Sequence, residues 1–142
     1  MGSGTRAYQM ALYVVLESGI QMLADTPTRY LQEAECTEYI ASVPVIWDET
    51  KVLDAKVGEY VVTARRKGDT WYIGGITNWH GRTIDVDLSF LGGKNMKGEL
   101  FRDGVNAWKK ARDYKREEKS VDTSKKFKIY MAPGGGFTLK LQ

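Results

Sequence analysis

A strict alternation of apolar and polar residues occupies the middle of the chain. In the stretch TIDVDLSF, apolar side chains stand at positions 84, 86, 88 and 90, and polar ones at 83, 85, 87 and 89. Successive side chains of a β-strand point to opposite faces of the sheet, so this period of two predicts a strand with one buried and one solvated face. Such strands are typical of antiparallel sheets.

Shorter runs of the same character fill most of the chain after residue 49. Turn signals such as RKGD at 66–69 and LGGKN at 91–95 separate them. The other runs are TKVLDAKVGEYVVTARR (50–66), TWYIGGITNW (70–79), KGELFRD (97–103), KFKIYMA (126–132) and GFTLKLQ (136–142). Together they predict a mainly β fold, an antiparallel β-sandwich of six to eight strands.

The first part of the chain has a helical period instead. Residues 5–24 are rich in good helix formers, with apolar or small residues at 7, 10, 11, 14 and 18 on one face. Because Tyr8, Leu12 and Val15 cover other faces, this helix is expected to pack on more than one side. Prolines at 27 and 44 bound a second helical stretch. We therefore predict one or two α-helices over residues 5–42, the sandwich over 43–142, and a tag remnant in MGSG at 1–4.

The glycine-rich stretch APGGGF at 132–137 raises the question of a phosphate-binding loop. Such a loop needs a Lys-Ser/Thr pair after its last glycine and a helix that follows. Here the alternating strand pattern FTLKLQ follows instead. We predict a turn that joins two strands, in which Pro133 sets φ and the glycines supply positive φ.

The segment between residues 103 and 124, DGVNAWKKARDYKREEKSVDTS, is polar and nearly balanced in charge. Trp108 and Tyr114 lie among basic residues, a combination that can stack nucleic-acid bases. Acidic residues at 113, 117 and 118 interrupt the positive charge. The pattern therefore favours a long solvated loop, with no nucleic-acid partner.

The amino-acid composition excludes several kinds of functional site. The chain has 142 residues, 42% of them hydrophobic, and 21 basic against 18 acidic side chains give a net charge of +3, which indicates no particular partner. Cys36 is the only cysteine and His80 the only histidine, so no internal disulfide, cysteine zinc site or multi-histidine metal site is expected. No signal peptide is recognisable, and the longest apolar run, MALYVVL, is too short to span a membrane.

Few residues are candidates for chemistry. Glu35 and Glu38 are three apart and would share a helix face, but a solvated face explains them better than a pair of catalytic carboxylates, so we expect no catalytic and no metal-binding residue. The aromatic residues Trp71, Tyr72 and Trp79 are candidates for contacting carbohydrate, as exposed aromatics do in sugar-binding sandwiches. The alternative is that the aromatic facing away from the sandwich core packs under the N-terminal helices.

Four stretches together resemble the C-terminal region of glycoside hydrolase family 97, bacterial α-glucosidases and α-galactosidases of the Bacteroides type. They are RAYQMALYVVLESGIQMLAD (6–25), ECTEYIASVPVIWDET (35–50), GEYVVTARRKGDTWYIGGITNW (58–79) and ELFRDGVNA (99–107), with APGGGF as a fifth. The resemblance implies that residues 5–42 are the end of a catalytic barrel that is otherwise absent. The family's catalytic carboxylates match no residue of this chain.

The resemblance implies a non-catalytic, structural or oligomerising β-sandwich domain of a glycoside hydrolase that cleaves α-glucosidic or α-galactosidic bonds. It further implies calcium and a periplasmic location for the parent enzyme, with the missing barrel as partner. Two alternatives stay open: a carbohydrate-binding sandwich and a free-standing protein-interaction module. We also expect self-association through the N-terminal helix, because its stripe with Leu12 and Val15 has lost the barrel.

Overall fold

The computed structural model describes residues 5–15, 38–39, 41–44, 46–107, 109 and 113–142. These residues form a helix and eight strands, which confirms the predicted mainly β class and the predicted number of strands. The elements are α1 (Arg6–Val15), β1 (Glu49–Lys56), β2 (Tyr60–Lys67), β3 (Thr70–Thr77), β4 (Arg82–Val86), a 3-10 turn (Ser89–Leu91), β5 (Asn95–Asp103), β6 (Tyr114–Asp122), β7 (Phe127–Met131) and β8 (Gly136–Leu141).

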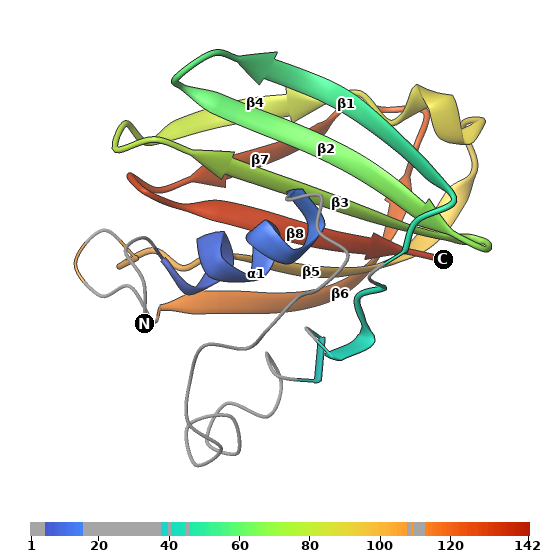
Figure 1. Cartoon of the computed structure of the whole chain (residues 1–142), viewed down its shortest axis with the longest axis horizontal. Helices are drawn as coiled ribbons and strands as arrows, with labels where there is room; N and C mark the ends of the chain where they lie inside the picture. Colours follow the sequence, from blue (N-terminus) through green and yellow to red (C-terminus); the bar gives the residue numbers. More distant parts are fainter. Residues whose placement is uncertain (1–4, 16–37, 40, 45, 108, 110–112) are drawn as a thin grey trace.

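The strands form two antiparallel sheets (Figure 1). The larger sheet has six strands in the order β1-β2-β3-β8-β5-β6, and the smaller one pairs β4 with β7. The chain therefore changes sheet four times, between β3 and β4, β4 and β5, β6 and β7, and β7 and β8. The stretch APGGGF makes the last of these changes, so the predicted turn between two strands is confirmed, although the strands that it joins belong to different sheets.

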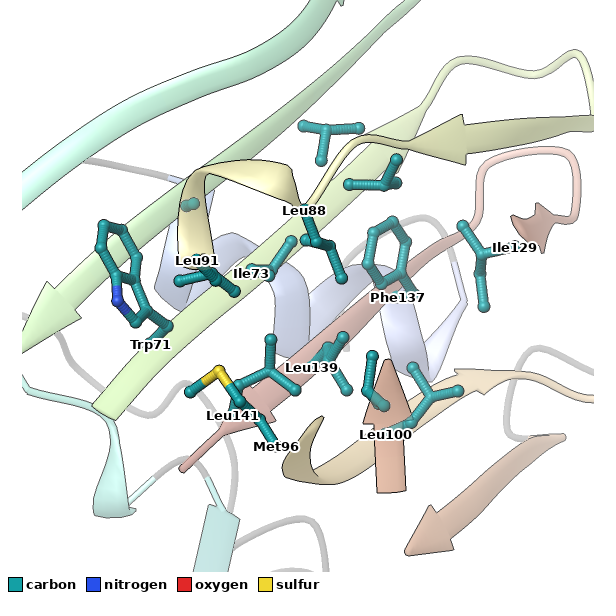
Figure 2. Packing of buried hydrophobic residues seen from close by; sticks show 14 of the residues in the cluster. Trp71, Ile73, Leu88, Leu91, Met96, Leu100, Ile129, Phe137, Leu139 and Leu141 are labelled. Atoms are coloured by element: carbon teal, nitrogen blue, oxygen red, sulfur yellow. The ribbon is translucent and has the colours of Figure 1, made fainter. Parts of the chain in front are cut away.

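The space between the two sheets holds the main core (Figure 2). Phe137, Leu139 and Leu141 of β8 point into it, and Ile129 faces them from the smaller sheet. Ile84 of the same small sheet belongs to this cluster. The alternation predicted for residues 83–90 is confirmed, because positions 84, 86 and 88 are buried and 83, 85, 87 and 89 are exposed. Strand β4 nevertheless ends at Val86, and the pattern continues into the 3-10 turn.

Helix α1 covers the opposite face of the six-stranded sheet, over β3 and β8 (Figure 1). Its stripe at residues 7, 10, 11 and 14 is completely buried, as the helical period predicts. Central strand β8 is consequently buried on both faces, and Thr138 has no exposed surface. The prediction of a half-buried strand at 136–142 was wrong, because the pattern of one strand does not show that a helix lies on its polar face.

The predicted solvated loop at 103–124 was also wrong over its second half. Residues Tyr114–Asp122 form β6, which pairs with β5 along its whole length. Charged side chains suit an edge strand, where they face solvent and form cross-strand pairs such as Arg102–Glu117 at 3.2 Å. Backbone pairing stabilises this strand without the apolar alternation that sequence reasoning seeks. Trp108 lies outside the described residues.

The run at 50–66 forms a hairpin of two strands rather than one long strand. Strands β1 and β2 pair from Glu49↔Arg66 to Lys56↔Tyr60 around a tight turn. Gly58 in that turn has a φ of 77°, a left-handed conformation that favours glycine. The predicted helix beyond residue 15 and most of the second helical stretch lie outside the described residues.

Candidate functional site

One end of the sandwich gathers four connections and the start of α1, and we call it the loop end. It comprises residues 57–59, 78–81, 104–107 and 132–135 with Thr5, because β1, β3, β5 and β7 all finish there. These connections lie towards the left of Figure 1. Binding residues are often found on loops that a rigid scaffold holds in place, so this end is the first place to look for function.

A buried carboxylate holds the loop end together. Asp103 at the end of β5 is 2% exposed, and its Oδ2 accepts hydrogen bonds from the amides of Ala132 at 2.8 Å and Gly136 at 3.1 Å. The amide of Thr5 in turn donates to the carbonyl of Gly134 at 3.0 Å. Asp103 therefore joins β5 to the glycine-rich turn, and that turn holds the beginning of α1.

The anion in the glycine-rich turn is thus a side chain of the protein itself. Gly134 adopts a φ of 65°, and the residues two positions before and after it, Ala132 and Gly136, donate their amides to Asp103. Burial raises the pKa of Asp103, while hydrogen bonds from Thr5, Ala132 and Gly136 act in the opposite direction. With its amides engaged in this way, the turn is a structural clamp rather than a site for phosphate.

The three aromatic residues predicted to contact carbohydrate separate in the structure. Trp71 is 9% exposed and lies between the sheets against Phe90, with ring centroids 5.0 Å apart. Tyr72 is 4% exposed and packs on the helix side of the sheet, as the alternative of packing under the N-terminal helices describes. Trp79 alone of the three is exposed, at 68%, and it lies in the loop end.

The ring of Trp79 lies directly over the glycine-rich turn. A Cβ atom built on Gly134 would come within 2.5 Å of that ring, so only glycine leaves room for it. Tyr130 is also exposed, and its hydroxyl lies close to Gly81 in the neighbouring connection. His80 is exposed beside Trp79, which agrees with the predicted position between two strands.

A shallow apolar groove of about 360 Å³ continues from the loop end along α1. Its walls include Tyr8 of the helix, Val57 of the first hairpin turn and Ile76 of β3. Val57 therefore belongs both to the loop end and to the groove, which makes the two a single continuous surface.

The other end of α1 is held by a buried cation. Arg65 of β2 donates through Nη2 to the carbonyl of Val15 at 3.0 Å, and its guanidinium lies 5.8 Å from the ring centre of Trp47. A positive charge at a C-terminal carbonyl and a negative one near the helix start both match the helix dipole. Asp103 and Arg65 thus fix α1 onto the sheet from opposite ends.

The described residues offer little for metal binding or membrane insertion. Within them no group of three or more His, Cys, Asp and Glu side chains is placed to hold a metal ion. None of their helices combines the length and the hydropathy that a membrane span requires. Glu38 lines a polar groove with Arg116 and Lys140, whereas Glu35 and Cys36 lie outside the described residues.

Comparison with known families agrees with this arrangement. Residues 46–142 match the sequence model described as "Glycosyl-hydrolase 97 C-terminal, oligomerisation". The chain belongs to this family. The match covers the sandwich, including every connection of the loop end, and begins after α1.

Relatives of the family 97 domain are much longer than this chain. A retaining α-galactosidase of Bacteroides thetaiotaomicron is 56% identical over 142 residues, which is all of this chain and 22% of that protein. A family 97 enzyme from Pseudoalteromonas sp. strain K8, solved with acarbose, matches with a TM-score of 0.90 and 39% identity over 98% of this chain and 22% of its own. A β-arabinopyranosidase matches with a TM-score of 0.77 and 31% identity over 96% and 21%.

Sequence reasoning on the family 97 domain missed the two features that define the loop end. Asp103 was included in the stretch ELFRDGVNA without any role, although an acid directly after a buried strand was a signal. Val57 and Val105 were not singled out, because an isolated valine in a turn carries no pattern. The division at residues 42 and 43 and the tag remnant at 1–4 stay predictions.

Proposed function

We propose that this domain forms a non-catalytic, assembly-promoting part of a longer glycoside hydrolase that cleaves α-galactosidic bonds with retention. The observation that carries the proposal is the match of residues 46–142 to a C-terminal domain described by oligomerisation. The 56% identity to a retaining α-galactosidase, over the whole chain, favours a galactoside over a glucoside. Catalysis then belongs to parts of the longer protein outside this chain.

Geometry supports the non-catalytic role. A glycosidase needs two carboxyl groups about 5–9 Å apart across a cleft that holds the sugar. Asp103 is buried as a structural clamp. Glu38 shares its groove with a second carboxylate, Glu99, but Arg116 and Lys140 line the same groove, and Arg116 forms an ion pair with Glu99 at 3.7 Å. Neither Asp103 nor Glu38 therefore has the surroundings of a catalytic acid or base.

The calcium implied for the parent enzyme does not fit the described residues, which lack a cluster of acidic ligands. We infer that it is held by the missing barrel, the expected intramolecular partner. A periplasmic location of the parent likewise rests on the family resemblance alone.

Incubation of the 142-residue chain with aryl α-galactosides and aryl α-glucosides, with and without calcium, tests the non-catalytic role. We expect no turnover above a heat-inactivated control. Turnover that disappears on Glu38→Gln would contradict the proposal. The galactoside preference requires the longer protein, in which a higher kcat/KM for the α-glucoside would be the contradicting result.

A carbohydrate-binding role is the second candidate, because the aromatic side chains of Trp79 and Tyr130 are both exposed. Titration with galacto- and maltooligosaccharides tests it by tryptophan fluorescence. We expect no saturable change up to millimolar sugar. A saturable change that Trp79→Ala abolishes would favour the carbohydrate-binding module instead.

The sequence favours α1 as the surface through which copies of the domain assemble. Leu12 and Val15 are half-buried in the described structure, so this stripe is only partly available. The variant Leu12→Glu, Val15→Glu measures its contribution by light scattering. Unchanged association in this variant would locate the contact elsewhere on the domain.

A further inference from the structure

The sheet edges are poor surfaces for a second copy of the chain. Strand β1 has an irregular register between Val52 and Asp54, which breaks the regular ladder that an added strand needs. Strand β6 carries charged side chains along most of its length. Bulges and charges on edge strands oppose strand addition, so the contact must be sought elsewhere.

The loop end is a better candidate than the sheet edges. Val57 is fully exposed, Val105 is 88% exposed and Trp79 is 68% exposed, although all three side chains are large and apolar. They come from three different connections at one end of the sandwich, and the groove beside α1 extends the surface from Val57. The connections that carry Val57 and Trp79 are hydrogen-bonded neighbours, whereas Val105 lies on the connection at the other edge of the six-stranded sheet. Exposed apolar side chains on neighbouring connections mark contact surfaces more often than isolated ones do.

Hydrogen bonds hold these connections in fixed positions. The amide of Asn78 donates to the carbonyl of Glu59 at 2.8 Å, and the amide of Gly134 donates to the carbonyl of Asn78 at 2.7 Å. The side-chain amide of Asn78 also donates to the carbonyl of Gly58 at 3.1 Å. Because these connections are already ordered, little conformational entropy is lost when a partner binds to them.

Charge at the rim is compatible with a second copy. Glu59 pairs with Lys56 at 3.1 Å and with Arg82 at 3.6 Å, so both signs lie beside the apolar side chains. Two identical surfaces related by a twofold axis can then meet without bringing charges of one sign together.

We infer that two copies of this chain associate through the loop end, with Trp79 and Val57 near the centre of the contact and Val105 at its edge. The inference rests on the proposed assembly role and assigns it to a surface. The three side chains and Tyr130 expose on the order of 500 Å² of apolar surface per copy, below the roughly 800 Å² of a standard interface. The dimer is accordingly expected to be weak and transient.

Sedimentation velocity of the 142-residue chain from about 1 to 300 μM tests the inference, with circular dichroism to verify that each variant is folded. Trp79→Asp and Val57→Asp should each weaken association at least about tenfold. Val52→Asp is the matched control, because Val52 is also exposed but lies on β1 away from the loop end, and its dimer should be unchanged.

Other outcomes separate the inference from the assembly role. If Leu12→Glu abolishes association and Trp79→Asp does not, the loop end is not the contact although the domain still assembles. If Val52→Asp weakens the dimer as much as Val57→Asp does, the contact is not confined to the loop end. A chain that stays monomeric at 300 μM contradicts both the inferred contact and the assembly role. The loop end would then be a surface that contacts the rest of a longer polypeptide.

Discussion

The two faces of the six-stranded sheet are covered in different ways. The inner face meets β4 and β7 through a mostly aliphatic core that contains Phe137, Leu139 and Leu141. The outer face meets α1 and the described residues between Glu38 and Trp47 through a mostly aromatic cluster: Met10, Val14, Tyr39, Val43, Tyr72 and Phe101, with Tyr13, Trp47 and Tyr114 beside them. Adjacent positions of one strand supply both layers, as Trp71 and Tyr72 show.

The difference lies in how polar groups are satisfied. The inner layer is apolar, whereas the outer layer buries the hydroxyl of Tyr39, the carboxylate of Asp103 and the guanidinium of Arg65, each of which has at least one hydrogen-bond partner. Buried polar groups are costly without such partners. The stability of the outer layer therefore depends on the geometry of its hydrogen bonds. That of the inner layer depends mainly on how completely apolar side chains fill the space between the sheets.

The largest effect is expected in the inner layer. Phe137→Ala should lower the free energy of unfolding by about 3–5 kcal/mol, because it removes a fully buried ring from between the sheets. Urea denaturation measures the loss. Phe127→Ala is the control, since that ring is only partly buried and should cost less than half as much. A loss below about 1.5 kcal/mol at Phe137 would mean that the layer repacks around the cavity.

The second largest loss of stability is expected on substitution of Asp103, the buried carboxylate that clamps the outer layer. Asp103→Ala leaves the amides of Ala132 and Gly136 without their acceptor and should cost about 2–4 kcal/mol. Asp103→Asn keeps an acceptor oxygen and should cost less. Urea denaturation of both variants at neutral pH decides this, and equal losses would show that the charge rather than the acceptor matters.

The carboxylate of Asp103 also leads to a prediction about how stability depends on pH. Its folded pKa is raised, so the folded state binds the proton more tightly than the unfolded state, and the contribution of Asp103 to stability falls as pH rises from its ordinary value of 3.8 through the raised pKa. The difference in stability between the parent and Asp103→Asn should therefore depend on pH in this window. Asp48, Glu59 and Glu117 have lowered pKa values in both proteins, so they cancel in the comparison. A difference independent of pH would contradict the prediction.

Two neighbouring glycines of β3 distinguish the layers at smaller cost. A Cβ on Gly74 would lie 2.9 Å from the Cβ of Val14 on α1, whereas one on Gly75 would meet the ring of Phe137. Each change to Ala should cost about 1–3 kcal/mol by overpacking. Hydrogen exchange should show faster opening of α1 in Gly74→Ala, and Trp71 fluorescence should change in Gly75→Ala. The same response in both variants would mean that the layers are not separable.

The smallest expected effect is that of one hydroxyl in the outer layer. Tyr39 Oη and Thr138 Oγ1 are 2.5 Å apart in a buried hydrogen bond. Tyr39→Phe should cost about 1 kcal/mol, and a double-mutant cycle with Thr138→Val should recover most of that energy as coupling. Tyr130→Phe, on an exposed tyrosine, is the control with no expected effect. Additive losses would contradict a direct bond.

Much of the fold could be predicted from local patterns. The alternation at 83–90, the stripe of α1 and the turn in APGGGF each depend on neighbours a few residues apart, and the structure confirms all three. The family, too, was recognisable from the order of short stretches along the chain. Hydrophobic period and turn chemistry are properties of the sequence itself.

Other features were decided only in three dimensions. Strand β6 has no apolar alternation and forms because β5 offers it an open edge, while β8 is buried on its polar face because α1 lies there. Val57, Trp79 and Val105 are more than 20 residues apart from one another, yet they reach one surface because antiparallel strands return their connections to the same end of the sheet. Local patterns in the sequence were enough to predict most of the strands, the buried stripe of the first helix and the family. Which side chains meet depends on sheet order, because contacts between distant segments are not contained in any local period.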